Sequence, residues 1–204
     1  MAPSVSPDFS PSPPCGGEAA IPRRSSPRPL PGRNTPTASR THTTGTFAFA
    51  SLNAGHIGDL LEGVARFNWS FPSRAGLGLP VRTTTVEIVT ASLGSNGVLL
   101  DGLTDRVDGL VVAAFGAGHV PESWCGRLVS LAREIPVVLA SRTGAGSVLA
   151  NTYDFPGSER YLLSRGLISA GRLDPPKARL LLYALLAAGI GPDDLAEDFN
   201  AHSS

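Results

Sequence analysis

From about residue 86 to the C-terminus, short apolar runs alternate with segments whose apolar residues recur at helical spacing. Four apolar runs, each bounded by glycines or polar turns, are typical of buried strands. They cover residues 86–91 (VEIVTA), 108–118 (DGLVVAAFGAG), 135–141 (IPVVLAS) and 167–171 (LISAG). Strands that alternate with helices build a parallel sheet, because each crossover is right-handed and places its helix over the sheet. The pattern therefore predicts an α/β domain with four parallel strands and helices on both faces.

Two helical segments are predicted in the first half of this domain. Residues 97–105 (GVLLDGLTD) follow the first strand, and Leu99 and Leu103 lie four positions apart, as on one face of a helix. Residues 122–134 (ESWCGRLVSLARE) follow the second strand and carry apolar residues at helical spacing, namely Trp124, Leu128 and Leu131. Both segments are expected to pack on the sheet through these residues.

Two further helices have recognisable start signals. Ser158 precedes a segment from Glu159 to about Arg165 and is expected to cap it, since a serine side chain accepts hydrogen bonds from the free N–H groups of a first turn. Asp174 is expected to cap a second helix in the same way, and the two prolines that follow it are tolerated in a first turn. This second helix should end at Gly189.

The second of these helices contains the apolar run 180–186 (LLLYALL), which is too uniformly apolar for a helix that faces solvent. We therefore expect the run to be buried in the core. It is far shorter than the ~20 apolar residues that span a bilayer, which argues against a membrane segment. Residues 191–199 (GPDDLAEDF) predict one more short helix.

The first 85 residues have a different character. Residues 1–40 contain 10 of the 18 prolines and no periodic apolar segment, so this leader is predicted to be disordered. In residues 41–85, FAF (47–49) and VARF (64–67) are predicted as short strands of a connector that contains a hairpin. The predicted organisation is a disordered leader (1–40), a connector (41–85) and an α/β domain (86–204).

Composition argues against several classes of function. The chain has 17 basic and 17 acidic residues and no basic stripe, so nucleic acid is not an expected partner. No apolar N-terminal segment of the kind found in secretory signals occurs, and no membrane partner is expected. Cys15 and Cys125 make neither a disulfide framework nor a metal-binding spacing, which fits a reducing compartment. The sequence therefore predicts a cytoplasmic protein.

Ligands of parallel sheets gather at the carboxyl ends of the strands, where three loops are candidates. They span residues 115–120 (FGAGHV), 141–147 (SRTGAGS) and the segment that ends at Glu159. Gly116 and Gly118 are better explained by a tight turn than by dinucleotide binding, because the third glycine of that fingerprint is missing. The second loop lacks the Gly-Lys-Ser/Thr ending of a phosphate-binding loop, and no Gly-x-Ser-x-Gly nucleophile turn occurs in the chain.

Two titratable residues of these loops are candidates for a site. On spacing alone, His119 is better explained as a solvated or structural histidine than as a functional one. Glu159 is equally well explained as a first-turn acid that the helix macrodipole favours. Taken alone, neither residue defines a site.

Several segments of the chain, in this order, resemble the last part of bacterial L-asparaginases, the amidohydrolases that convert asparagine to aspartate and ammonia. The segments are THTTGTFAF (41–49), SLNAGHIGDLLEG (51–63), DGLVVAAFGAGHVP (108–121), IPVVLASRTGAGSV (135–148) and TYDFPGSERYLLSRGLISAGRLDPPKARLLL (152–182). The resemblance covers residues 41 to about 188. It implies the interdomain connector and the small C-terminal α/β domain of that family, with a flavodoxin-like or Rossmann-like sheet.

The resemblance also implies where the family carries its catalytic groups. The nucleophilic threonine lies in a Thr-Gly-Gly-Thr stretch, and a second threonine and an aspartate lie in a His-Gly-Thr-Asp-Thr stretch. Neither stretch occurs in these 204 residues. The catalytic lysine of the family stands just before Thr41, where this chain has Arg40, and an arginine does not release its proton as a lysine can. No catalytic residue is therefore predicted in this chain, and the family implies no metal or organic cofactor.

Two residues are implied to bind substrate. In the family, the C-terminal domain of one subunit closes the active site of its neighbour with a polar residue after the second strand and a glutamate before the fourth. These positions hold His119 and Glu159, and the family usually has asparagine or serine at the first of them. The resemblance implies that the turn at Pro156 and Gly157 presents Glu159 to the partner subunit, where its carboxylate pairs with the α-ammonium group of L-asparagine.

The sequence leaves two functions open. The chain is expected to be an asparaginase-family protein, N-terminally truncated and inactive alone, that works in a homo-oligomer or with a partner asparaginase subunit. The alternative is a noncatalytic binding or oligomerisation module derived from the same domain.

The composition of residues 1–40 resembles the product of out-of-frame translation of GC-rich DNA. We therefore expect a misassigned gene start or a frameshift near codon 40. Translating the upstream DNA in all three frames tests this expectation, which is wrong if no frame contains the two threonine stretches.

Overall fold

The computed structural model describes residues 40–46, 48–53, 55, 57–68 and 76–203. The leader that was predicted to be disordered lies outside the described residues, except for Arg40. Arg40 is part of the first strand and pairs with Ala50, so it belongs with the connector rather than with the leader.

Two antiparallel hairpins occupy the predicted connector. β1 (Arg40–Thr41) pairs with β2 (Phe49–Ala50), and β3 (Gly58–Leu61) pairs with β4 (Val64–Phe67). The strand predicted for residues 64–67 is found as β4, whereas the one predicted for residues 47–49 shares only Phe49 with β2, and residue 47 lies outside the described residues. Each of the two belongs to a hairpin of its own. The turn between β3 and β4 consists of two residues with positive φ, as the favoured two-residue hairpin turns require.

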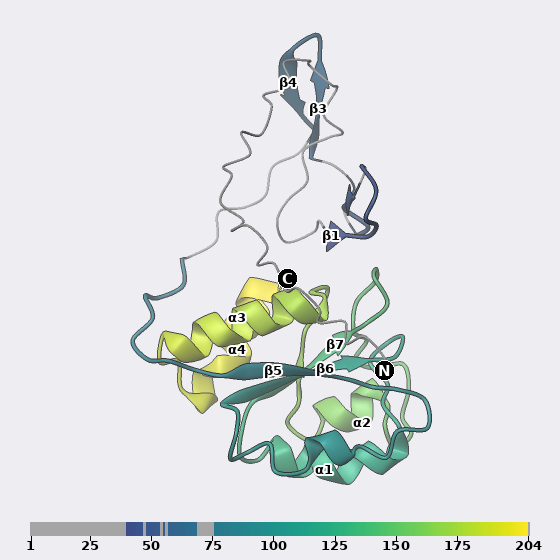
Figure 1. Ribbon diagram of the computed structural model, residues 1–204, viewed down its shortest axis with the longest axis vertical. Helices are drawn as coiled ribbons and strands as arrows, with labels where there is room; N and C mark the ends of the chain where they lie inside the picture. The colour runs from purple at the N-terminus through teal and green to yellow at the C-terminus, as the bar shows by residue number, and fades with distance from the viewer. Residues whose placement is uncertain (1–39, 47, 54, 56, 69–75, 204) are drawn as a thin grey trace, which may run out of the picture. The chain divides into compact units, whose positions relative to one another are not determined.

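A four-stranded parallel sheet forms the centre of the α/β domain, as the sequence predicts (Figure 1). Its strands are β5 (Val86–Thr90), β6 (Gly109–Ala114), β7 (Val137–Ser141) and β8 (Ile168–Ser169). They lie side by side in the order of the sequence, so every connection joins neighbouring strands. All four carboxyl ends therefore lie at one edge of the sheet, where the loops after β6 and β7 are neighbours.

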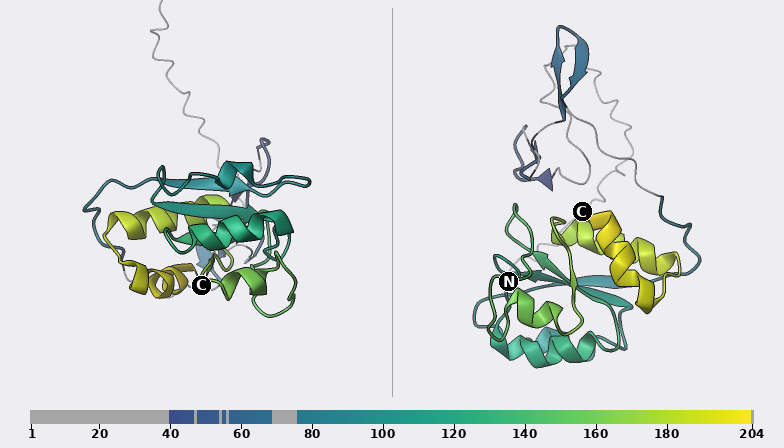
Figure 2. Two further views of the ribbon diagram at one scale, coloured as in Figure 1. Left: turned by 90° about the horizontal axis from the view of Figure 1, so that it is seen from below. Right: turned by 180° about the vertical axis from the view of Figure 1, so that it is seen from behind.

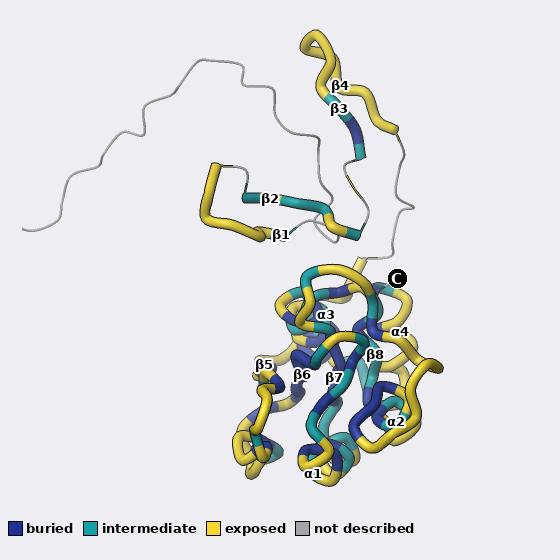
Figure 3. The backbone as a smooth tube through the Cα atoms, turned by 90° about the vertical axis from the view of Figure 1, so that its right-hand side faces the viewer, coloured by how far each residue is buried: buried dark blue, intermediate teal, exposed yellow. Residues whose placement is uncertain are grey.

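The central strands carry the core of the domain. Every residue of β6 is buried, as expected for a parallel strand that is covered on both faces (Figure 3). Its residues alternate between two hydrophobic clusters, with Leu110 and Val112 on one face of the sheet and Val111 on the other. This alternation fixes the register of the strand, because a shift by one residue would exchange the two faces.

Helices cover both faces of the sheet, as predicted, but they reach the two faces by different routes (Figure 1, Figure 2). The helices are η2 (Glu122–Trp124), α1 (Cys125–Leu131), α2 (Glu159–Leu163), α3 (Pro175–Ala187) and α4 (Pro192–Ser203). Because the strands follow one another in order, the right-handed crossovers place α1 and α2 on the same face. The other face is closed by α3, which packs against β5, β6 and β7, with α4 packed against α3.

Both predicted helix caps are confirmed. At the start of α2, the Oγ of Ser158 accepts a hydrogen bond from the N–H of Tyr161 (3.3 Å). At the start of α3, the Oδ1 of Asp174 accepts one from the N–H of Lys177 (3.0 Å). Helix α3 ends before Gly189, whose φ of 82° is the left-handed conformation in which many helices terminate.

The helix predicted for residues 97–105 is wrong. This segment forms only the short 3-10 helix η1 (Val98–Leu100). Leu99 is 71% exposed whereas Leu103 is buried, so the two residues do not share a face. Leu103 lies beyond the end of η1 and follows Gly102, whose φ of 68° is outside the right-handed helical region, so no helix connects Leu99 to Leu103.

Helix α3 is buried on one side only. Leu182 and Leu185 are buried, whereas Leu180 is 61% exposed. The prediction that the whole run 180–186 is buried is therefore wrong. A helix that packs on a sheet with one side exposes the residues of its other side to solvent. None of the described helices is long and apolar enough to cross a membrane.

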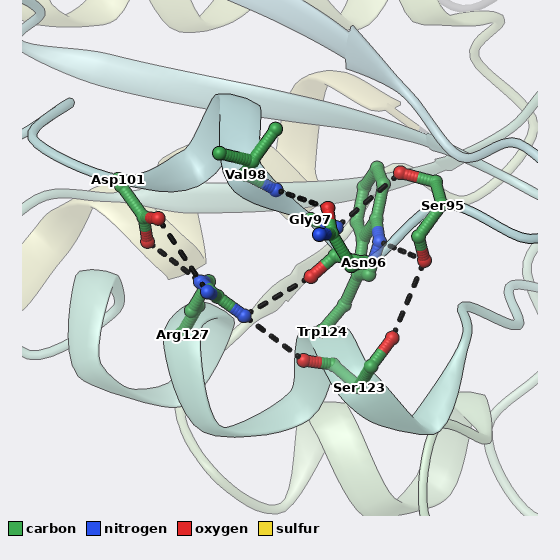
Figure 4. Close-up of polar contacts among 8 residues, drawn as sticks. All are labelled: Ser95, Asn96, Gly97, Val98, Asp101, Ser123, Trp124 and Arg127. Carbon is green, nitrogen blue, oxygen red and sulfur yellow. Dashed lines mark hydrogen bonds and ion pairs between the residues drawn. The ribbon is translucent and has the colours of Figure 1, made fainter.

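A polar network fixes the crossover after β5 against the start of α1 (Figure 4). The Nε of Arg127 donates to Oδ1 of Asp101 (2.6 Å), and its Nη1 donates to the carbonyl of Asn96 (3.0 Å). The indole N–H of the buried Trp124 donates to the carbonyl of Ser95 (3.1 Å). These bonds tie the loop that leaves β5 to the first residues of α1, so this crossover is held in place although it contains little regular helix.

Candidate functional site

The loop after β6 turns back on itself at the carboxyl edge of the sheet. The N–H of Phe115 donates to the carbonyl of His119 (2.8 Å), and the N–H of His119 donates to the carbonyl of Phe115 (2.9 Å). Between them, Gly116 and Gly118 have positive φ angles of 44° and 119°. The glycine pair thus forms a tight turn, and the turn places His119 at the edge of the sheet.

Glu159 is the first residue of α2, and its side chain is completely buried. Its Oε1 accepts two backbone hydrogen bonds, from the N–H groups of Thr152 (3.2 Å) and Tyr153 (3.0 Å). Its Oε2 lies 3.1 Å from the Nε2 of His119. Both carboxylate oxygens are therefore occupied within the domain.

These hydrogen bonds keep the buried carboxyl of Glu159 ionised. Burial by itself raises its pKa, because a low-dielectric environment disfavours the charged form. The hydrogen bonds from the backbone N–H groups of Tyr153, of Glu159 itself and of Thr152, together with that from His119, outweigh burial and lower the pKa below its ordinary value. A carboxylate, not a carboxylic acid, therefore faces the histidine at neutral pH.

The imidazole of His119 is held on three sides. Besides its contact with Glu159, the ring meets the ring of Tyr153 edge-on, with 4.8 Å between the centroids, and the ring of Phe155 at 5.2 Å. The side chain of His119 is 25% exposed, and both aromatic residues are partly exposed. The site at the surface is thus a histidine flanked by two aromatic rings, with an ionised glutamate buried beneath it.

Two glycines allow the two loops to approach this closely. A Cβ at Gly157 would lie 2.4 Å from the carbonyl oxygen of Val120, and the N–H of Val120 donates to the carbonyl of Gly157 (2.9 Å). A Cβ at Gly118 would lie 3.2 Å from the Cβ of Glu159 and 3.0 Å from the side chain of Val148. The packing of the β6 loop against the start of α2 therefore depends on glycine at both positions.

Sequence reasoning missed the contribution of Tyr153 and Phe155. Both residues lie in the connection between β7 and α2, and both rings contact the imidazole of His119. The sequence signal for this pair was their separation by two positions, because every second side chain of an extended segment lies on the same side.

Arg142 was also missed. Its guanidinium lies over the ring of Phe115, 4.3 Å from the centroid, and its Nη1 donates to the carbonyl of Ala91 (2.8 Å). Because the backbone of Phe115 pairs with that of His119, Arg142 braces the loop that carries the histidine against the end of β5. Its position directly after β7 was the only sequence signal for this role.

The side chain of Glu159, which the resemblance implied in binding substrate at a partner subunit, is buried in this chain. The turn at Pro156 and Gly157 leads the chain into α2 with Glu159 directed inward, and His119 is the exposed member of the pair. Glu159 also stands at the first position of a helix, where the macrodipole favours an acid. A structural role and a role in a site are therefore compatible for this residue.

Metal and thiol chemistry find no support in the described residues. They contain no group of three His, Cys, Asp or Glu side chains that could hold a metal ion. Cys125 is a free, buried thiol, and burial together with the charge of Glu122 raises its pKa. A thiol in such surroundings is a poor nucleophile, so we assign Cys125 to the core.

The sequence model of the family described as "Glutaminase/Asparaginase C-terminal domain" matches residues 85–199, a range that contains the whole parallel sheet and both His119 and Glu159. The chain belongs to this asparaginase family. It is 34% identical to the probable L-asparaginase of Deinococcus radiodurans over 166 residues, which are 80% of this chain and 51% of that protein. It is 30% identical to the L-asparaginase of Bacillus licheniformis over 105 residues, which are 50% of this chain and 32% of that protein.

The matches confirm that the α/β domain is an asparaginase C-terminal domain, as the resemblance implied. This asparaginase-family chain spans about half the length of the Deinococcus protein that it matches. Its sheet, its tight turn after β6 and its capped helix α2 are therefore features of an asparaginase C-terminal domain, and His119 and Glu159 lie within it.

Proposed function

We propose that this chain supplies the C-terminal half of an L-asparaginase, which hydrolyses L-asparagine to L-aspartate and ammonia in the cytoplasm. The carboxyl edge of its sheet contributes His119, supported by Glu159, to an active site in a neighbouring subunit. The nucleophilic threonine comes from an asparaginase N-terminal domain, because the two threonine stretches of the family do not occur in these 204 residues. The functional unit is therefore a complex in which a partner asparaginase subunit supplies that domain.

The observation that carries this proposal is the His119–Glu159 pair inside a domain of the asparaginase family. A partly exposed imidazole and a buried ionised carboxylate meet at the edge of a parallel sheet where ligands bind. The substrate class is supported by the names of the relatives, a probable L-asparaginase from Deinococcus radiodurans and an L-asparaginase from Bacillus licheniformis.

Restoring activity from two chains tests the proposal. The 204-residue chain is mixed with a separately expressed N-terminal domain of an L-asparaginase, and ammonia release from L-asparagine is measured for the mixture and for each chain alone. We expect ammonia release above the blank only in the mixture. Only the mixture contains both the nucleophilic threonine and the residues that close the active site over the substrate. His119→Ala and Glu159→Ala should each lower this rate, on the order of tenfold or more, since each removes a hydrogen bond that involves a charged group.

Asp154→Asn is a matched control for these variants. Asp154 is an exposed acid beside the same aromatic residues, and it forms a surface ion pair with Arg160 (3.5 Å). Exposed ion pairs contribute little to stability, so this variant should keep the rate of the mixture. A complex that forms with the N-terminal domain but releases no ammonia would contradict the proposal and favour a noncatalytic oligomerisation module.

A further inference from the structure

We propose that the β3–β4 hairpin docks through one of its two faces onto the N-terminal half of an L-asparaginase. The docking face consists of Leu60, Ala65 and Phe67, which are apolar and exposed in this chain. This inference rests on the proposed function, because it assigns the surface that holds the partner subunit in that assembly. It concerns association alone and uses none of the residues of the candidate site.

The register of the hairpin places the three residues on one side. Directly opposite residues of an antiparallel pair point to the same face, and successive residues of a strand point to opposite faces. Leu60 stands opposite Ala65. Two positions farther along each strand, Gly58 stands opposite Phe67. The face that these residues share therefore carries only apolar side chains.

The other face of the hairpin is polar in its middle. Asp59 stands opposite Arg66, and Nδ2 of Asn68 donates a hydrogen bond to Oδ2 of Asp59 (3.2 Å). Leu61 and Val64 complete this face beside the turn. Burying charged groups removes their hydration at a large cost in free energy. The polar face is therefore suited to remain in water, and the docking face is the one suited to be covered.

The described part of the chain does not cover the docking face. Within these residues, β3 and β4 contact mainly each other. All four residues of β4 are exposed, as Figure 3 shows. A two-stranded hairpin is only marginally stable in water unless a third strand or another packing partner buries one of its faces. The hairpin therefore needs a further body against its apolar side.

The relative from Deinococcus radiodurans indicates what this body is. Its match spans 80% of this chain and therefore includes the hairpin, wherever in the chain the match begins. The model of the C-terminal domain, in contrast, matches only from residue 85. The hairpin thus corresponds to a segment that precedes the C-terminal domain of that relative. About half of the relative's length lies outside the match, which is enough for a domain with a core of its own.

A second copy of this chain is the competing occupant, and it suits the docking face less well. Pairing of β4 with the same strand of a second copy would lengthen the sheet but leave the face uncovered, because side chains stand perpendicular to the hydrogen-bonded plane. Two copies stacked face to face would bring together only three side chains from each. That area falls well short of the roughly 800 Å² per partner that a stable interface buries.

Co-expression of the 204-residue chain with the N-terminal half of the Deinococcus radiodurans protein tests the inference, because the two chains then fold in each other's presence. We expect a complex that is purified through a tag on the 204-residue chain. Amide hydrogen exchange of residues 58–67 should be slower in the complex than in the 204-residue chain alone. Leu60→Ser and Phe67→Ser should each raise the Kd of the complex on the order of ten- to a hundredfold, since each removes an apolar side chain that the partner buries. Analytical ultracentrifugation of a dilution series measures the Kd.

Leu61→Ser is the matched control. Leu61 follows Leu60 in the same strand and is exposed to a similar extent, 51% against 42%, but it lies on the other face. The same substitution there should change the Kd by less than about threefold, as for an ordinary surface position. Equal weakening by Leu60→Ser and Leu61→Ser would overturn the inference, because it would show loss of the hairpin and not of one face.

Three further outcomes would contradict the inference. One is the absence of a complex on co-expression, and another is a complex whose Kd changes with neither Leu60→Ser nor Phe67→Ser. The third is a dimer of the 204-residue chain alone that Phe67→Ser dissociates, which would identify a second copy as the occupant. None of these measurements uses ammonia release. A complex that depends on the docking face but releases no ammonia would support this inference and contradict the proposed function, so the two failures are distinguishable.

Discussion

Purified alone, the 204-residue chain should release ammonia from L-asparagine no faster than the buffer blank. Hydrolysis of an amide needs an activated nucleophile and a group that manages its proton. Removing the central members of such a unit costs several powers of ten in rate. Neither of the threonine stretches that supply these groups in the family occurs in the chain, so we expect a loss of this size relative to a complete asparaginase assayed in parallel.

The remaining hydroxyl groups of the connector should not substitute for the missing nucleophile. Thr43 and Thr44 are exposed, and the Oγ1 of Thr43 accepts a hydrogen bond from the N–H of Gly45 (3.3 Å). In the described part of the chain, no Lys, His, Asp or Glu side chain is bonded to either hydroxyl. Residue 40 is an arginine, and a guanidinium group does not act as a base as a lysine amine can. Ammonia release that disappears in Thr43→Ala or Thr44→Ala would contradict this prediction.

The parallel sheet was predictable because its strands are buried on both faces. Such strands appear in the sequence as continuous β-branched or apolar runs, and 135–141 is an example that became β7. The caps of α2 and α3 were predictable because capping is local, as Ser158 and Asp174 show. The exposure of Leu99 and Leu180 was not predictable, since an apolar side chain is buried only if another element covers its side of the helix.

Only two residues of the candidate site were indicated by the sequence, and neither the aromatic residues beside them nor their arrangement was predictable. The family resemblance identified His119 and Glu159, but they lie 40 positions apart, and no spacing rule connects residues at that separation. The inward direction of Glu159 depends on two backbone N–H groups, of Thr152 and Tyr153, whose side chains are irrelevant to these bonds. Every residue except proline has a backbone N–H group, so residue types do not reveal which of these groups bind the carboxylate. A sequence pattern therefore could not indicate that the histidine, and not the acid, reaches the surface.

The largest effect on stability is expected for Gly157→Ala, compared with Gly166→Ala as a matched control. The two glycines have nearly the same backbone conformation, with φ of 96° and 97°. Alanine is strained at both positions, which costs about 1–3 kcal/mol. An added Cβ meets nothing within 4 Å at Gly166, but at Gly157 it would lie 2.4 Å from the carbonyl oxygen of Val120.

The backbone of Val120 cannot yield without opening the site, because its N–H donates to the carbonyl of Gly157 and the residue before it is His119. Gly157→Ala should therefore lower the free energy of unfolding by about 2–6 kcal/mol, the sum of backbone strain and overpacking. Gly166→Ala should lower the free energy of unfolding only by the cost of the backbone strain, about 1–3 kcal/mol. Urea unfolding of both variants measures the difference. Equal stability of the two variants would show that the Val120 loop is free to move, and that Gly157 does not hold the histidine against Glu159.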